Sequence, residues 1–118
     1  MKLAIPLDET KTEVCVSFGR APYFLFRDTE TGTTEIQTNT AAEAQGGAGL
    51  KAAQIVADAG TTDLITVRCG ENAAEVLRAA EVQIWKSSGP NAEDNIKALL
   101  ENKLEKLTHF HAGFHGIQ

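Results

Sequence analysis

Cys69 is the side chain with the widest choice of chemistry in this sequence, because it stands between Arg68 and Gly70 in the run RCGEN. A neighbouring arginine and the start of a helix both favour the thiolate, which binds soft metals and reacts in redox chemistry. The alternative is that Cys69 is a small apolar residue that closes a strand. Cys15 alternates with two valines, a pattern that favours packing on a sheet face over metal binding.

Two further segments contain residue types suited to an anion. Arg20 lies in the run SFGRAP, where its guanidinium offers a fork of hydrogen-bond donors, although it could equally be a solvated turn residue. The run QGGAGLKAA, residues 45–53, places three glycines at an expected helix start, where exposed backbone N–H groups can receive an anion. This run is neither a GxGxxG motif nor a P-loop, and its alternative is a flexible joint between the strand-rich and helical halves.

All three histidines lie near the C-terminus, at His109, His111 and His115. Imidazoles two residues apart in an extended chain point the same way, and a third could complete a site for a borderline metal. Ordering this glycine-containing segment costs entropy. We therefore interpret residues 108–118 as a flexible tail whose metal affinity is adventitious.

The sequence lacks several motifs that are common in enzymes. No HExxH, GxSxG or CxxC occurs, and every histidine lies in the tail, away from any nucleophile of the ordered region. The acidic residues fall mostly in turns and on helix surfaces, rather than in a set that converges on a metal. We therefore predict that the protein is not an enzyme.

The elements that position these residues follow from turn residues and hydrophobic periodicity. The predicted strands span residues 2–7, 13–18, 23–28, 33–38, 63–68 and 82–86. The predicted helices span residues 46–60, 72–80 and 91–107, with Asn72 as the cap of the second and Asn91 as the start of the third. Hairpins and right-handed crossovers then give an α/β fold, with a mixed sheet and helices on both of its faces.

Ligands in such a sheet tend to bind beyond the carboxyl ends of the strands, where the loops diverge. The runs RCGEN and KSSGPN each follow a predicted parallel strand, so we expect both at one edge of the sheet. Whether SFGRAP joins them depends on strand pairing that spacing leaves open.

Size, charge and the first residues limit the class of protein. A chain of 118 residues suits one domain, which we place at residues 1–107, before the tail. The formal net charge of -5 and the lack of a basic cluster argue against nucleic acid as a partner. The apolar start is too short for a signal peptide or a membrane span, so we expect a cytoplasmic protein with reduced thiols.

Four segments together resemble the dinitrogenase iron-molybdenum cofactor biosynthesis family: MKLAIPLDE, SFGRAPYFLFRD, GGAGLKAAQIVADAGTTDLITVRCGENAAEVLRAAEVQIW and KSSGPNAEDNIKALLENKLEKL. That family includes carriers and scaffolds of nitrogenase cofactor assembly and the molybdenum-copper orange protein of sulfate reducers. The resemblance implies a three-layer ribonuclease H-like fold with a five- or six-stranded sheet. It also implies non-catalytic binding of a molybdenum- or iron-containing sulfide cluster. The candidate cluster-binding residues are Ser17, Phe18, Gly19, Arg20, Ala21, Gly46, Gly47, Gly49, Arg68, Cys69, Gly70 and Asn72.

Ser17 departs from many relatives, which carry a histidine before the FGRAP run, so a cluster ligand used elsewhere is missing here. Two cysteines cannot supply the four thiolates of an ordinary iron-sulfur cluster, so the cluster must bring its own sulfides unless subunits share one. A thiomolybdate-type cluster fits these limits. In this hypothesis Arg20 and Arg68 supply charge, backbone amides of the glycine-rich runs donate hydrogen bonds, and Cys69 is an optional soft contact.

The expected function is therefore storage or transfer of an anionic molybdenum-sulfide cluster, with copper or iron as a further metal. Iron-molybdenum cofactor or its precursor is the alternative cargo. A rival interpretation is a regulatory or interaction module that docks a partner protein through the same loop edge. The expected partners are the cluster and a protein that donates or accepts it, with no nucleic acid and no membrane. We expect a monomer or a weak dimer.

Overall fold

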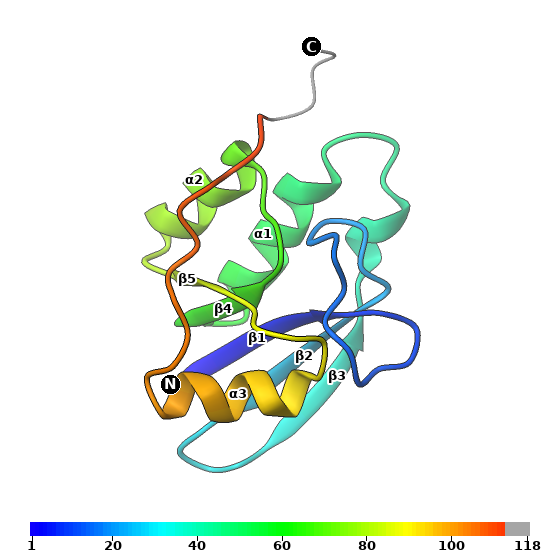
Figure 1. Cartoon of the computed structure of the whole chain (residues 1–118). Coiled ribbons are helices and arrows are strands. Elements are labelled where there is room, and N and C mark those ends of the chain that lie inside the picture. The colour runs from blue at the N-terminus through cyan, green and yellow to red at the C-terminus, as the bar shows by residue number, and fades with distance from the viewer. Residues whose placement is uncertain (113–118) are drawn as a thin grey trace.

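A computed structural model describes residues 1–112, and its centre is a five-stranded mixed sheet (Figure 1). Its strands are β1 (Lys2–Leu7), β2 (Tyr23–Asp28), β3 (Thr34–Thr38), β4 (Asp63–Thr66) and β5 (Gln83–Lys86). They lie in the order β3-β2-β1-β4-β5. The β1-β2 and β2-β3 pairs are antiparallel, whereas β4 is parallel to both β1 and β5. The predicted mixed sheet is therefore confirmed.

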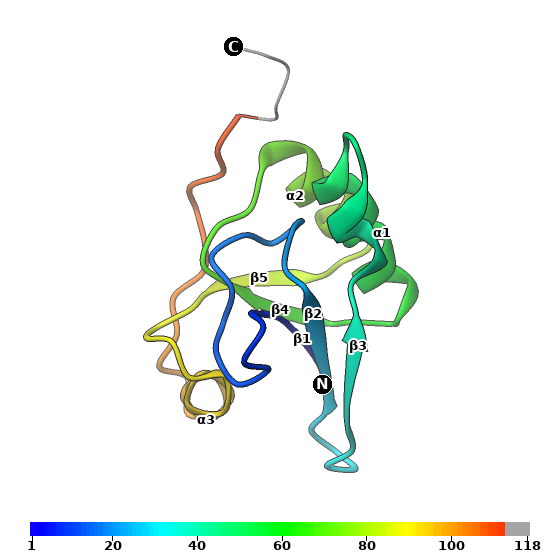
Figure 2. The ribbon, with the colours of Figure 1, turned by 90° about the vertical axis from the view of Figure 1, so that its right-hand side faces the viewer.

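Helices cover both faces of this sheet, as Figures 1 and 2 show. They are α1 (Ala48–Asp58), α2 (Glu71–Ala79) and α3 (Ala92–Leu100), and a 3-10 turn, η1 (Thr40–Glu43), precedes α1. α1 and α2 lie on one face and α3 on the other (Figure 1). The alternation of β1 explains this division, because Ala4 packs in the α1-α2 core whereas Leu3 and Ile5 pack in the α3 core. The ribonuclease H-like form of the fold stays a prediction.

Small side chains let α1 approach the sheet closely. Ala52 and Ala53 are fully buried with Val56, while Ile55 is only half-buried. Gly60 follows the helix with a φ of 78°, a conformation that glycine adopts without the strain a Cβ causes. The predicted helix is thus present, shortened at both ends.

Within residues 1–112 no helix combines the length and the hydropathy that a membrane span requires.

The predicted strand over residues 13–18 is wrong, and the six-stranded alternative is wrong with it for the described residues. β1 already has β2 on one side and β4 on the other, so no edge of β1 is left for this segment. It crosses the end of β1 instead, with an isolated bridge between Leu7 and Val14. The Cys15 amide donates to the Pro6 carbonyl at 2.8 Å. Cys15 is half-buried and is not a sheet-face residue.

α3 ends at Leu100 rather than at the predicted Leu107. The Lys103 amide donates to the Ala98 carbonyl at 2.8 Å, and Asn102 has a φ of 59°, as in a Schellman stop. The chain then turns and runs along β5, with the Lys86 amide donating to the Glu105 carbonyl at 2.8 Å. Leu107 stays buried in this extended segment, on the α1-α2 side of the sheet. The prediction that Leu107 is a core residue is correct, but the prediction that it lies in a helix is wrong.

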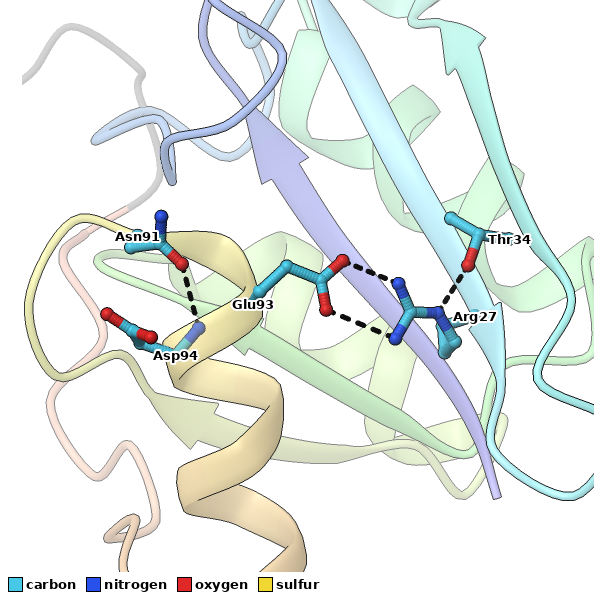
Figure 3. A network of polar contacts seen from close by, with 5 residues as sticks. All are labelled: Arg27, Thr34, Asn91, Glu93 and Asp94. Atoms are coloured by element: carbon cyan, nitrogen blue, oxygen red, sulfur yellow. Dashed lines mark hydrogen bonds and ion pairs between the residues drawn. The ribbon is translucent and has the colours of Figure 1, made fainter.

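A bidentate ion pair ties β2 to the start of α3 (Figure 3). Arg27 Nη2 lies 2.6 Å from Glu93 Oε2, Nη1 lies 3.3 Å from Oε1, and Nε donates to the Thr34 hydroxyl. The helix begins after Asn91, whose side-chain oxygen accepts from the Asp94 amide at 2.8 Å. The predicted helix start at Asn91 is confirmed, and Asn91 is its N-cap.

Candidate functional site

A cavity of about 710 Å³ lies where the loops that follow β1 and β4 meet the starts of α1 and α2. Its size falls in the range of roughly 300–1,000 Å³ typical of ligand pockets. The predicted residues that line it are Ser17, Phe18, Gly19, Arg20, Gly46, Gly47, Gly49, Arg68, Cys69, Gly70 and Asn72. The remaining lining residues, which the sequence did not single out for this cavity, are Val16, Gln45, Ala48, Leu50, Ala73 and His111. The SFGRAP run therefore joins the RCGEN run at one site.

The start of α1 forms one wall of the cavity. Gly47 precedes the helix in a left-handed conformation, with a φ of 71° and no side chain to cap the first turn. Within residues 1–112 the amides of Ala48, Gly49 and Leu50 have no hydrogen-bond acceptor. Orphan N–H groups at a helix N-terminus attract anions, because the helix dipole adds to their own partial charge.

The start of α2 forms the facing wall. Gly70 is the N-cap and Glu71 the first helical residue, so the predicted Asn72 cap is wrong. The Glu71 amide donates to the His111 carbonyl at 2.9 Å, which leaves the next two amides, of Asn72 and Ala73, as donors at the cavity. An asparagine two residues into a helix has helical backbone angles and cannot serve as its cap.

The two arginines that were expected to supply charge both line this cavity, but they differ in their partners. Arg20 Nη1 donates to the Ala42 carbonyl at 2.9 Å and to the Ala44 carbonyl at 2.6 Å. Arg68 is exposed, and within residues 1–112 it makes no hydrogen bond or ion pair through its side chain. Arg20 therefore has a structural task in holding the C-terminal end of η1, and Arg68 is the arginine available to a ligand.

Asn39 fixes the position of the SFGRAP loop, and sequence reasoning missed it. Its side chain is 2% exposed, and its Nδ2 donates to the Gly19 carbonyl at 3.0 Å and to the Ala21 carbonyl at 2.8 Å. Its Oδ1 accepts from the Ala41 amide at 3.0 Å, which caps η1. An asparagine before a helical run can be recognised as a cap from the sequence, but its distant carbonyl partners cannot.

Ala21, one of the candidate cluster-binding residues, is fully buried and does not line the cavity.

Cys69 lies at the cavity but is not the thiolate that its neighbours suggested. The residue is 1% exposed, and burial raises the pKa of the thiol to about 11 against a weaker opposing effect from Arg78. The desolvation of a buried anion outweighs the nearby positive charge, so the thiol is neutral at pH 7. Cys69 packs with Ala73 and Ala74 in the α1-α2 core, as the apolar alternative supposed.

The C-terminal segment brings one of the three histidines to the cavity. His111 lines it, while His109 is exposed and does not, and His115 lies outside the described residues. His111 pairs with Gly70 in a parallel bridge. The flexible tail over residues 108–118 stays a prediction. Within residues 1–112 no group of three His, Cys, Asp or Glu side chains could hold a metal ion.

The KSSGPN run does not line the cavity. It follows β5 and turns toward α3, where the buried Asn95 side chain accepts from the Ser88 amide at 2.7 Å and donates to the Gly89 carbonyl at 3.1 Å. This run therefore shapes the connection to α3, on the other side of the sheet.

The electrostatics of the cavity run against those of the chain as a whole. The formal net charge is -5, yet the residues lining the cavity include Arg20, Arg68 and His111 and no aspartate or glutamate. Two helix N-termini border the same space. The arrangement suits a polarisable anion that accepts hydrogen bonds and can contact the apolar side chains among them.

Comparison with known proteins identifies the family. A family model described as dinitrogenase iron-molybdenum cofactor matches residues 1–102. The chain belongs to this family. This member of the dinitrogenase iron-molybdenum cofactor family is 31% identical to an uncharacterized protein of Methanocaldococcus jannaschii over 110 residues, 91% of this chain and 92% of that protein.

Two solved structures place this family member among similar folds. The apo form of the orange protein from Desulfovibrio gigas matches with a TM-score of 0.83 and 25% identity, over 91% of this chain and 92% of that one. A Thermotoga protein described as NifB-like, of the DUF35 family, matches with a TM-score of 0.78 and 38% identity, over 92% and 95%. The predicted family is confirmed, and it points to a cofactor-related binding or carrier role rather than to catalysis.

Proposed function

We propose that the cavity binds an anionic molybdenum-sulfide cluster, with copper or iron as a further metal, and that the protein stores or transfers this cargo without catalysis. The observation that carries the proposal is the charge of the lining. Although the chain is acidic, no described carboxylate lines the cavity, whereas two arginines and the starts of two helices do. Family membership and the likeness to orange protein support a metal-sulfur cargo over other anions.

The protein would hold the cluster mainly through hydrogen bonds and charge. Within residues 1–112 the Arg68 guanidinium and the amides of Ala48, Gly49 and Leu50 have no hydrogen-bond acceptor, so all of them are available as donors. Charge-assisted hydrogen bonds are roughly twice as strong as neutral ones. Sulfide and thiomolybdate sulfur atoms accept such bonds, so no protein thiolate is required.

The cysteines set the limit on direct metal bonds. Cys69 is buried as a neutral thiol, and Cys15 lies outside the cavity lining. An ordinary iron-sulfur cluster needs about four cysteine thiolates, which one chain of this sequence does not contain. The cargo therefore has to arrive with its own sulfides.

The test is reconstitution with tetrathiomolybdate and copper, followed by desalting. We expect a coloured species that stays with the protein and contains molybdenum, copper and sulfide. Arg68→Ala should retain less of it, because this variant removes a cavity-lining cation that has no partner within residues 1–112. A wild-type protein that emerges colourless and free of metal would contradict the proposal.

A second candidate function is docking of a partner protein through the same edge. Val16 is 58% exposed and Leu50 is 43% exposed, and both belong to the cavity lining. Exposed apolar residues beside a positively charged cavity suit a contact with another protein. A partner could be the donor or acceptor of the cluster, or a target regulated without any cluster. Purification from the native host separates these cases, because a colourless, metal-free protein bound to a partner would favour docking alone.

A further inference from the structure

We propose that His111 is a binding residue of this cavity, and that its Nε2 coordinates a copper or iron atom of the bound cluster. This inference rests on the proposed function and adds to it one direct bond between protein and metal. It concerns a residue from the end of the chain, about forty positions after the Arg68–Gly70 loop that it faces.

The C-terminal segment carries His111 to the cavity along a defined path. The Leu107 amide donates to the Ile84 carbonyl at 3.0 Å, so the segment runs beside β5 as an added edge. Phe110 is half-buried, and the Arg78 guanidinium lies 4.6 Å from the centre of its ring. The Glu71 amide then donates to the His111 carbonyl at 2.9 Å. These contacts hold the backbone of His111 at the start of α2.

The imidazole of His111 lies against Gly70. A Cβ atom at Gly70 would be 3.1 Å from His111 Cε1 and 3.6 Å from each ring nitrogen. The ring therefore occupies the space that a side chain at residue 70 would need. His111, Gly70 and Arg68 all line the same cavity, so the ring and the guanidinium that we assign to the cargo border one space.

The hydrogen bond at Nδ1 determines which nitrogen is available. His111 Nδ1 lies 3.3 Å from the Ala112 carbonyl oxygen, which can only accept. The tautomer that satisfies this contact carries its hydrogen on Nδ1 and leaves the lone pair of Nε2 for a metal. A backbone carbonyl that fixes the tautomer in this way is the usual support of a metal-binding histidine.

His111 would act as one ligand of a cluster and not as part of a mononuclear site. The described residues contain no group of three metal-ligating side chains, so His111 lacks the companions that a single ion needs. A cluster that already holds its metals through sulfide needs only one further donor. Imidazole nitrogen suits copper and iron, whereas molybdenum would keep its sulfides.

The experiment compares reconstitution with tetrathiomolybdate and copper in the wild type, His111→Ala and His109→Ala. His109 is exposed and outside the cavity lining, so it is the matched control for adventitious binding. We expect His111→Ala to lose the cargo at least about 10–100-fold faster on dilution, since removing only the support of a metal ligand already costs this range. Copper X-ray absorption should find one nitrogen neighbour in the wild type and in His109→Ala, and only sulfur in His111→Ala.

A second variant displaces the ring without removing it. Gly70→Ala introduces the Cβ that would lie 3.1 Å from the ring, so the imidazole should shift and the nitrogen neighbour of copper should weaken or vanish. If the wild type holds no cargo, the proposed function itself fails. If the wild type and His111→Ala hold it equally, with identical copper neighbours, only the role of His111 is overturned.

Discussion

Gly19 lies so close to the start of α1 that a Cβ atom built on it would be 2.7 Å from the Gly49 nitrogen. The first loop of the cavity and its first helix thus meet without any side chain between them. This contact sets the spacing of one cavity wall, and it requires glycine at residue 19 for reasons of space.

Gly19→Ala should therefore destabilise the fold by about 1–3 kcal/mol, the usual cost of overpacking. Gly49 belongs to a helix backbone that cannot move aside as a flexible side chain would. Gly46→Ala is the matched control, because a Cβ there meets nothing within 4 Å. Urea unfolding of both variants measures the difference. Equal midpoints for Gly19→Ala and the wild type would show that the close approach does not exist in solution.

Asn39→Ala should cost about 1–3 kcal/mol, because the substitution leaves the Gly19 and Ala21 carbonyls without their side-chain donor. Thr40→Ala changes an exposed neighbour and should leave stability within about 0.5 kcal/mol of the wild type. Thermal unfolding followed by circular dichroism gives both values. The account of how the loop is held is wrong if the two variants behave alike.

Arg68→Ala should weaken retention of the reconstituted cluster about tenfold, the loss expected when one charge-assisted hydrogen bond is removed. The stability of the fold should not change, since the side chain has no partner within residues 1–112. Lys51→Ala removes an exposed cation outside the cavity lining and serves as the control. Added salt should weaken the binding of the wild type more than that of Arg68→Ala. Retention by Arg68→Ala that matches the wild type at every salt concentration would remove Arg68 from the site.

Cys69 should resist thiol reagents in the folded protein. The variant Cys15→Ala, which keeps only Cys69, should react slowly at pH 8, whereas Cys69→Ala, which keeps the half-buried Cys15, should react faster. Burial raises the pKa of Cys69 from 9.0 to about 11, so the folded state binds more protons than the unfolded state between those values. The free energy of unfolding should therefore fall as pH rises through this window, and Cys69→Ala should reduce that fall. Rapid labelling of Cys69 at pH 8 would contradict its burial.

Local patterns were sufficient for most of the elements, whereas the meeting of the SFGRAP and RCGEN loops was expected from the family resemblance and not from spacing. The alternation of residues 2–7 and 23–28 predicts two real strands, and ligand loops beyond the carboxyl ends of strands follow from topology. Residues 13–18 alternate in the same strand-like way, but alternation indicates only which side chains are buried. It does not show whether a strand with a free edge is available for pairing, and β1 has none because β2 and β4 flank it.

The remaining errors have the same origin in tertiary contacts. Leu104 and Leu107 continue the helical spacing of α3, yet the Schellman stop at Asn102 ends the helix before them. Both leucines are buried in the extended segment that follows. The sequence places a cation beside Cys69, but the depth of burial that keeps the thiol neutral depends on packing between two helices. His111 reaches Gly70 because residues 105–107 pair with β5, and no local sequence pattern predicts this pairing.

The central claim is that this cavity holds the cluster, and an amide-resolved NMR titration of the protein with tetrathiomolybdate and copper tests it most directly. The account predicts that the largest shifts fall on the amides at the starts of the two helices, namely Ala48, Gly49, Leu50, Asn72 and Ala73, while α3 stays unchanged. Shifts confined to α3 or to the far edge of the sheet, or a spectrum that does not change at all, would contradict it.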